Sequence, residues 1–228
     1  MPRSSPEPPA RVLRVETLGS VPYERGLELQ TERVLDVRSG GAPDTLFLLE
    51  HPPVITLGSS SDPAHVLLDE ADRASRGIEL HETGRGGDVT LHVPGQLVGY
   101  PILDLKPDRQ DLHRYLRDLE WTLIQTLGAF GITAGREPGY TGVWCEGGKI
   151  GAIGVRVSSG WITSHGFALN VEPDLSLYET IVPCGIPDRP VTSMARELGR
   201  APAIAEVGRE AARSLAARFG YRLEDVKF

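Results

Sequence analysis

Cys184 and Lys149 are the two side chains of this sequence best suited to covalent chemistry. Cys184 lies in the segment Ile-Val-Pro-Cys-Gly-Ile-Pro, which is too rich in Pro and Gly for a helix or a long strand. The segment therefore predicts a loop with a restricted backbone, and reactive groups concentrate on such loops. Cys184 is thus a candidate nucleophile, although this segment alone does not exclude a small buried apolar residue.

Lys149 follows Glu146-Gly147-Gly148 and begins the run Lys-Ile-Gly-Ala-Ile-Gly-Val. A lysine next to a turn is usually a solvated charge. Gly151 and Gly154 weaken a strand, however, which indicates that something approaches its backbone closely, and a bound ligand chain is one candidate. An ammonium group near a thiol favours the thiolate, so Lys149 could activate Cys184. Cys145 lies in the strand-like segment Gly-Val-Trp-Cys-Glu and is better explained as a small buried residue.

The stretch from Thr83 to Gln96 is unusually rich in glycine and begins Thr-Gly-Arg-Gly-Gly-Asp. Its glycines permit positive φ and could present successive N–H groups to an anion. Arg85 would add a fixed positive charge. The alternative is a plain glycine-rich hairpin turn.

Other signatures of chemistry are absent from the sequence. It contains no Walker A motif, no GxGxxG after a strand, no HExxH and no CxxC, which disfavours nucleotide and zinc chemistry. The six histidines show no metal-ligand spacing, so each is expected to be structural or solvated, and we predict no metal site.

Hydrophobic periodicity predicts the elements that must position these residues. Helices are expected over 23–37 and 112–127, with Asp111 near the start of the second and Gly128 just past its end, and a last helix opens at Pro202. Strands are expected over 11–17, 46–49, 54–57, 89–93 and 97–105. Glycine turns separate three more, 141–145, 149–157 and 161–170, which predicts consecutive antiparallel hairpins. Runs of strands with helices between them indicate the α+β class. We predict one domain over residues 11–228 after a disordered Pro-rich tail, residues 1–10.

Composition bounds the function. The chain is 40% hydrophobic and 24% charged, which is typical of a soluble globular protein. Its formal net charge of −7 argues against non-specific nucleic-acid binding. No segment resembles a secretory signal or a membrane span, and the two cysteines form no disulfide framework. We therefore expect a cytoplasmic protein with no membrane partner.

Several ordered motifs resemble the octanoyltransferase family of lipoate biosynthesis. The segment from Arg85 through Val98 is similar to the family signature Arg-Gly-Gly-x-x-Thr-x-His-Gly-Pro-Gly-Gln. Segments 142–156, 163–170 and 181–185 match its lysine, histidine and cysteine segments in family order, and weaker likeness extends to 50–58. Val93 stands where glycine is usual, which is expected to narrow one wall of the pocket. Ser59 stands where arginine is common, so a contact to the donor is expected to be missing.

The resemblance implies a single domain with the catalytic fold of biotin and lipoate protein ligases, with mixed and antiparallel sheets and flanking helices. It implies transfer of octanoyl from octanoyl-acyl carrier protein to a lysine of lipoyl domains, through a thioester on Cys184 assisted by Lys149. The implied substrate-binding residues are Arg85, Gly86, Gly87, Asp88, Val89, Thr90, Leu91, His92, Ala152, Ile153, Gly154, Gly166, Phe167 and Ala168. His92 and His165 join the Gly86-Gly87 turn and Gly166 as candidate oxyanion donors.

The implied acceptors are the lipoyl domains of 2-oxoacid dehydrogenase E2 subunits and the glycine cleavage H protein, and no cofactor is needed. Both kinds of partner are acidic in related systems, so a basic rim is expected, with Arg85, Lys149 and Arg156 as candidates. One rival is an ATP-dependent lipoate or biotin ligase, which would use residues 84–87 for phosphate and would not need Cys184. The other is an acyl-binding module without chemistry.

Overall fold

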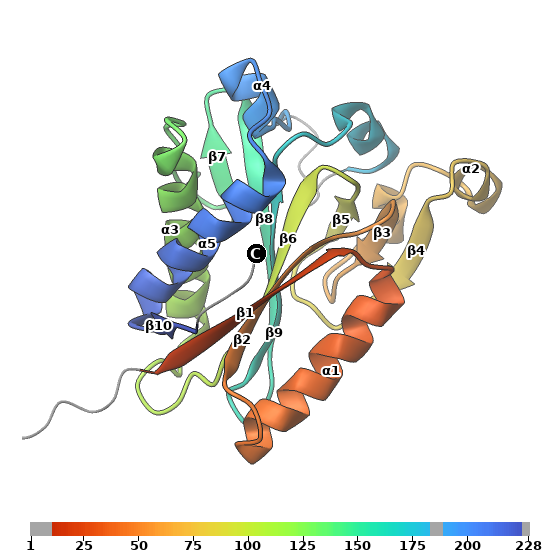
Figure 1. Ribbon diagram of the computed structural model, residues 1–228. Coiled ribbons are helices and arrows are strands. Elements are labelled where there is room, and N and C mark those ends of the chain that lie inside the picture. The colour runs from red at the N-terminus through yellow and green to blue at the C-terminus, as the bar shows by residue number, and fades with distance from the viewer. Residues whose placement is uncertain (1–10, 183–188, 225–228) are drawn as a thin grey trace, which may run out of the picture.

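The computed structural model describes residues 11–182 and 189–224, which form two sheets with helices packed against them (Figure 1). In chain order the elements are β1 (Val12–Ser20), α1 (Tyr23–Ser39), β2 (Asp44–Glu50), β3 (Val54–Leu57), η1 (Pro63–His65), α2 (Glu70–Ser75), β4 (Glu79–Glu82), β5 (Val89–His92), β6 (Gln96–Ile102), α3 (Leu112–Ala129), β7 (Val143–Cys145), β8 (Gly148–Val157), β9 (Thr163–Asn170), η2 (Leu175–Thr180), α4 (Met194–Leu198), α5 (Ile204–Phe219) and β10 (Arg222–Leu223).

The larger sheet has the order β10-β1-β2-β6-β9-β8-β7. β1 is parallel to β10 and β2, whereas the pairs from β2 to β7 are antiparallel, so the sheet is mixed. β7, β8 and β9 form the two consecutive hairpins that the glycine turns predicted. The smaller sheet has the order β4-β3-β5. The predicted α+β class with mixed and antiparallel sheets is confirmed.

Helices cover both faces of the larger sheet (Figure 1). α3 and α5 pack together on one face, where α5 buries the predicted stripe that includes Val207, Leu215 and Phe219. α1 lies on the other face against β6 and β9. The central strand β6 is therefore covered on both faces, and every one of its residues is buried. β6, β8 and β9 form a rigid platform for whatever lies beside them.

The smaller sheet has its own apolar cluster, to which β5 contributes alternate residues. Val89 and Leu91 are fully buried and point into this cluster with Ile55 of β3. Thr90 and His92 alternate with them and face the opposite side. β5 thus presents two polar side chains from a strand that its apolar residues hold in place.

Periodicity located the long elements well, with two kinds of error. α3 continues through Gly128, which was expected just past its end, to Ala129, because the left-handed residue that follows this helix is Gly131 with φ +83°. The short elements β4, α2, α4 and β10 were not predicted. Within the described residues, every helix is too short or too polar to cross a membrane.

Candidate active site

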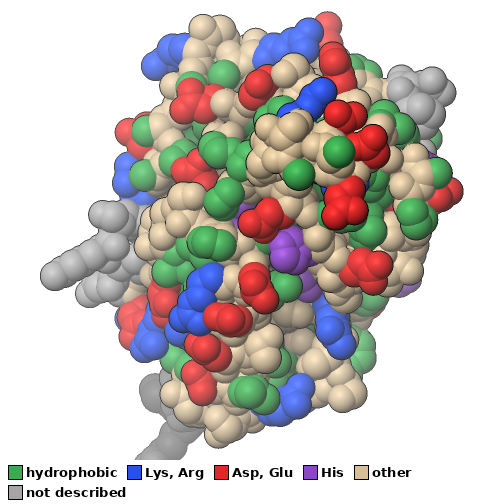
Figure 2. All heavy atoms as spheres, turned by 90° about the vertical axis from the view of Figure 1, so that its right-hand side faces the viewer, with side chains coloured by type: hydrophobic (Ala, Val, Ile, Leu, Met, Phe, Trp, Pro, Cys, Tyr) green, Lys and Arg blue, Asp and Glu red, His purple; other side chains and the backbone are tan. Residues whose placement is uncertain are grey.

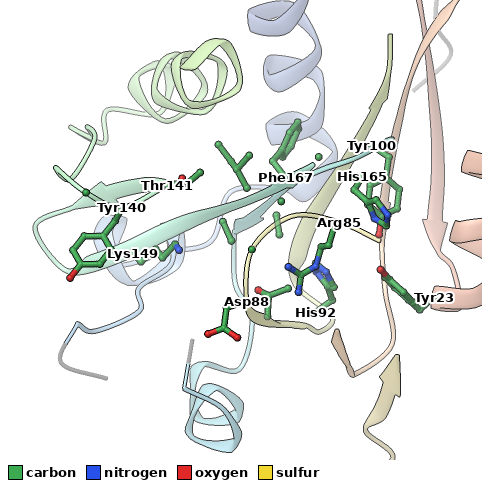
Figure 3. Close-up of a pocket in the computed structure, with 18 residues that line it drawn as sticks. Tyr23, Arg85, Asp88, His92, Tyr100, Tyr140, Thr141, Lys149, His165 and Phe167 are labelled. Atoms are coloured by element: carbon green, nitrogen blue, oxygen red, sulfur yellow. The ribbon is translucent and has the colours of Figure 1, made fainter. Parts of the chain in front are cut away.

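A cavity of about 240 Å³ lies where β6, β8 and β9 meet the glycine-rich turn at 84–88 and the start of α1 (Figure 3). Most of the predicted site residues line it: Arg85, Gly87, Asp88, Thr90, His92, Lys149, Ala152, Ile153, Gly154, Gly166, Phe167 and Ala168. They come from the turn, from β5, and from the neighbouring strands β8 and β9. Segments far apart in the sequence thus converge on one hollow.

Lys149 stands at one end of the cavity, beside Tyr140 and Thr141 (Figure 3). Only 7% of its surface is exposed, and its Nζ lies 5.5 Å from the centre of the Trp144 ring. Its main chain is bonded to the segment 190–192, since its N–H donates to Pro190 O at 2.9 Å and its carbonyl accepts from Thr192 N at 3.0 Å. The side chain of Lys149 is therefore buried at one end of the cavity, on a strand whose main chain is held in place.

Cys184, the predicted nucleophile, lies outside the described residues. The described chain on its two sides is anchored near the cavity. Before it, Val182 N donates to His65 O at 2.8 Å, and the His65 ring bonds the cavity residue Asp88 at 2.6 Å. After it, Pro190 accepts the hydrogen bond from Lys149.

Cys145 is described, and its surroundings disfavour chemistry, as the sequence indicated. Burial and, to a smaller extent, the negative charge of nearby Glu197 raise the pKa of its thiol to about 11. Its Sγ is 3.6 Å from the carbonyl of Gly148. The thiol of Cys145 is protonated at neutral pH and is a poor nucleophile.

Arg85 is buried, and its guanidinium holds the turn against the smaller sheet. It donates to the Thr56 carbonyl at 2.6 Å, to Thr56 Oγ1 at 2.8 Å and to Gly86 O at 3.1 Å. Gly86 N–H is also occupied, because it donates to Val155 O at 2.8 Å. The predicted anion nest is therefore wrong for Gly86, whose N–H serves to dock the turn on β8.

The two glycines of β8 that indicated a close approach are explained by the protein itself. A Cβ on Gly154 would lie 3.0 Å from Gly86 O, and one on Gly151 would lie 3.0 Å from a methyl group of Leu123 on α3. Gly154 also lines the cavity. The absence of a side chain at Gly154 therefore leaves room both for the turn at 84–88 and for the cavity.

The end of the cavity opposite Lys149 is formed by Tyr23, Tyr100, His92 and His165 (Figure 3). His51 lies behind them and bonds Tyr100 Oη at 2.7 Å and Val21 O at 2.6 Å. His92 Nδ1 bonds Gln96 Oε1 at 2.7 Å. The structure places His92 and His165 in the same cavity as Lys149, and their role as oxyanion donors stays a prediction.

The histidines at this end are neutral at physiological pH. Burial lowers the pKa of His92 to about 3, and it lowers the pKa of His51 and of His165 to about 4. The imidazole rings at this end thus carry no charge, and the nearby Arg85 supplies the positive charge that helps to keep His92 and His165 neutral.

These depressed pKa values predict a pH-dependent stability. An unfolded histidine takes up a proton below about pH 6.5, whereas the buried ones stay neutral down to about pH 4, so the free energy of unfolding should fall as pH drops through this window. Each group contributes up to about 1.4 kcal/mol per pH unit. Urea titrations at pH 7.5 and 5 would measure the decrease. The decrease should shrink in His92→Gln and persist in His113→Gln, which changes an exposed histidine; an equal decrease in both variants would contradict this assignment.

Some predicted residues do not reach the cavity. Val89 and Leu91 lie in the apolar cluster of the smaller sheet, because strand alternation turns them away from Thr90 and His92. Val93 is also buried in that cluster, so it does not narrow the pocket wall. The expected basic rim is corrected as well: Arg85 and Lys149 are buried, and only Arg156 is exposed. On the face shown in Figure 2, acidic and basic side chains are interspersed.

Other lining residues were missed. Tyr23 was predicted only as part of the apolar stripe of α1, and Tyr100 only as part of a buried strand. Tyr140 and Thr141 lie in a loop whose end is fixed from α3, where the buried Glu120 accepts from Gly142 N at 3.2 Å and pairs with Arg136 at 2.7 Å. No local pattern signals that link, although the acidic residue at a buried helix position is a partial clue.

Residues 22–216 match the family model described as the lipoyl protein ligase A/B catalytic domain, and the chain belongs to this family. Within it the chain is an acyltransferase. It is 50% identical to an octanoyltransferase of Chloroflexus aggregans over 93% of this chain and 97% of that one, and 54% identical to an octanoyltransferase of Rubrobacter xylanophilus over 84% and 86%. A crystal structure of lipoate-protein ligase A bound with ATP matches with a TM-score of 0.74 and 19% identity, over 94% of this chain and 89% of that chain. That likeness concerns the fold, and it confirms the expected ligase-type catalytic domain.

Proposed function

We propose that the protein transfers octanoyl from octanoyl-acyl carrier protein to a lysine of lipoyl domains, through a thioester on Cys184. The supporting observation is the place of Lys149. This buried ammonium lies at one end of a cavity with small and apolar walls, and its main chain bonds Pro190, six positions after Cys184. The acyltransferase relatives support the reaction class.

In the proposed reaction, Cys184 carries the acyl group and Lys149 carries the proton. The Cys184 thiolate attacks the donor thioester carbonyl, the bond to the carrier sulfur breaks, and the carrier thiolate takes a proton from Lys149. Neutral Lys149 then accepts a proton from the incoming lysine amine as that amine attacks the acyl-Cys184 carbonyl. The amide forms, the Cys184 thiolate leaves, and the thiolate–ammonium pair is restored. Formation of the amide from a thioester drives the second step.

The walls next to Lys149 suit the octanoyl tail. Ala152, Gly154, Gly166 and Ala168 are small residues of paired strands, and Phe167 supplies an aromatic surface (Figure 3). Burial of the tail contributes roughly 0.8 kcal/mol per CH₂, or about 5 kcal/mol in all. The tail would extend from Lys149 toward Tyr23, Tyr100 and His165.

The acceptors in this proposal are lipoyl domains of 2-oxoacid dehydrogenase E2 subunits and of the glycine cleavage H protein. Arg156 is exposed and remains a candidate contact for an acidic partner. Asp88, in the glycine-rich turn at 84–88, forms an ion pair with His65 at 2.6 Å. The reaction as written consumes no ATP and requires no cofactor.

Intact-mass spectrometry tests the proposal. The protein is incubated with octanoyl-acyl carrier protein without ATP, beside a Cys184→Ala variant and a Cys145→Ala control. We expect one octanoyl adduct on the wild type and on Cys145→Ala, labile to hydroxylamine, and none on Cys184→Ala. Addition of an apo lipoyl domain should discharge the adduct and acylate the domain.

Two outcomes would overturn the proposal. If Cys184→Ala acylates the lipoyl domain at the wild-type rate, Cys184 does not carry the acyl group. If transfer needs ATP and free octanoate, the protein is an acyl-adenylate ligase. The lipoate-protein ligase A structure that shares its fold is bound with ATP.

A further inference from the structure

A second groove of about 400 Å³ adjoins the far end of the cavity, on the side away from Lys149. It runs along α1 and has an apolar side made by Leu27, Val34 and Leu35, with Ile162 opposite. The rest of its lining is polar or charged and includes Gln30, Arg38, Glu82, Thr83 and Arg156. The elements that bound the cavity continue into it. Leu27 of the groove lies one helical turn after Tyr23 of the cavity, and Ser164 of the groove lies two positions before Gly166 of the cavity on β9.

His165 is the one described residue that lines both hollows. Its backbone is left-handed, with φ +56°, which is uncommon for a residue with a side chain. Its N–H donates to Oε1 of the buried Gln30 of α1 at 2.6 Å, and its ring meets that of Tyr100 edge-on at 6.2 Å. Contacts from both flanking elements hold this unusual backbone, and the imidazole is 6% exposed.

We infer that His165 is a partition that closes the acyl cavity at its far end and so limits the length of the acyl chain that the protein accepts. The inference rests on the proposed function, because it takes the reacting carbonyl to lie at Lys149. A chain that starts there and follows β8 and β9 meets the His165 ring at the end of the cavity (Figure 3). Without the ring, the cavity would open into the groove along α1, where Leu27, Val34 and Ile162 offer apolar surface to a longer chain.

His165→Gly is the direct test, because glycine adopts positive φ without strain and keeps the N–H that bonds Gln30. Octanoyl and dodecanoyl carrier protein are supplied at equal concentration in one reaction with an apo lipoyl domain, and the two products are weighed by mass spectrometry. Each methylene that the opened groove buries is worth roughly a factor of four. We expect the dodecanoyl-to-octanoyl product ratio to rise about tenfold or more. The ratio does not depend on how much of the variant is folded.

Two further variants locate the effect. His165→Asn, which is smaller and tolerates a left-handed backbone, should raise the ratio to an intermediate value. His165→Gly combined with Leu27→Trp should return the ratio toward that of the wild type, because the indole fills the groove. His113→Ala changes an exposed histidine on α3, across the sheet, and should leave the ratio unchanged.

Calorimetric binding of octanoate and dodecanoate to the same proteins keeps the inference separate from the proposed function. If the wild type transfers no octanoyl group, the proposed function fails, yet the binding preference still reports whether His165 limits chain length. A preference that is the same in wild type and His165→Gly overturns the inference. If the raised preference for dodecanoate persists when Leu27→Trp is added, the longer chain does not enter the groove.

Discussion

Replacing Lys149 with methionine should slow octanoyl transfer by about two to four orders of magnitude, the range typical for loss of a positioned proton-transfer group. Methionine preserves most of the volume of the buried side chain against Trp144, so the fold should persist. In the proposed cycle the variant loses both the ammonium that favours the Cys184 thiolate and the base for the incoming amine. Steady-state transfer to an apo lipoyl domain measures the decrease.

Lys106→Met is the matched control, because Lys106 is exposed and pairs only with Asp104 at 3.6 Å among the ion pairs of the described chain. It should transfer octanoyl at the wild-type rate. The pH profile adds a readout that a structural role would not change. The rate of acyl-enzyme formation in Lys149→Met should recover at high pH, where Cys184 ionises without help. A Lys149→Met variant within a factor of three of wild type at neutral pH would rule out the proposed role.

Gly166→Ala should strongly destabilise the fold, because the added methyl group would collide with the neighbouring strand β6. A Cβ there would lie 2.2 Å from Gly99 O and 2.5 Å from Pro101 Cδ. Both atoms belong to β6, which is hydrogen-bonded to β9 on one side and β2 on the other, so neither can retreat. We expect a decrease of about 3 kcal/mol or more in the free energy of unfolding, measured by urea denaturation.

Gly128→Ala adds the same methyl group but should raise the free energy of unfolding. Gly128 is in α3 and is exposed, and no heavy atom of the described chain beyond its neighbours in the helix backbone lies within 4 Å of the position that the added methyl group would take. Alanine favours the helix, so this variant should gain about 0.5–1 kcal/mol. Equal effects of the two substitutions would show that packing between β6 and β9 is looser than the distances indicate.

The long helices and the hairpins were predictable because their signals are local. The apolar stripe of α5 and the glycine turns at 147–148 and 159–160 each lie within one segment. β4 was not predictable, since Glu79, His81 and Glu82 give it no strand-like pattern on an edge that is largely exposed. β10 has two residues, and only its distant partner β1 makes it a strand.

The lining of the cavity was predictable where motif and position coincide, as for Lys149 and Thr90, and was not where tertiary contacts decide. Arg85 reads as a free charge in a glycine-rich turn, yet the Thr56 carbonyl binds its guanidinium. Tyr23 fits a core stripe, yet the first turn of α1 opens onto the cavity. Whether a residue faces the core or the cavity depends on the element packed against it, and the local sequence does not identify that element.

The pairing of β1 with β10 has a consequence for how the chain matures. Arg14 and Glu224 form an ion pair at 2.6 Å although they are 210 positions apart, and Arg222 N donates to Arg11 O at 2.8 Å. During synthesis, the outer edge of β1 at Val12 and Leu13, the two residues that β10 covers, must therefore remain unpaired until almost the entire described chain has emerged from the ribosome. Open edges invite association with other nascent chains, so this is the interval of greatest vulnerability. β6, β8 and β9 lie beyond β2, so the cavity can assemble before that edge closes.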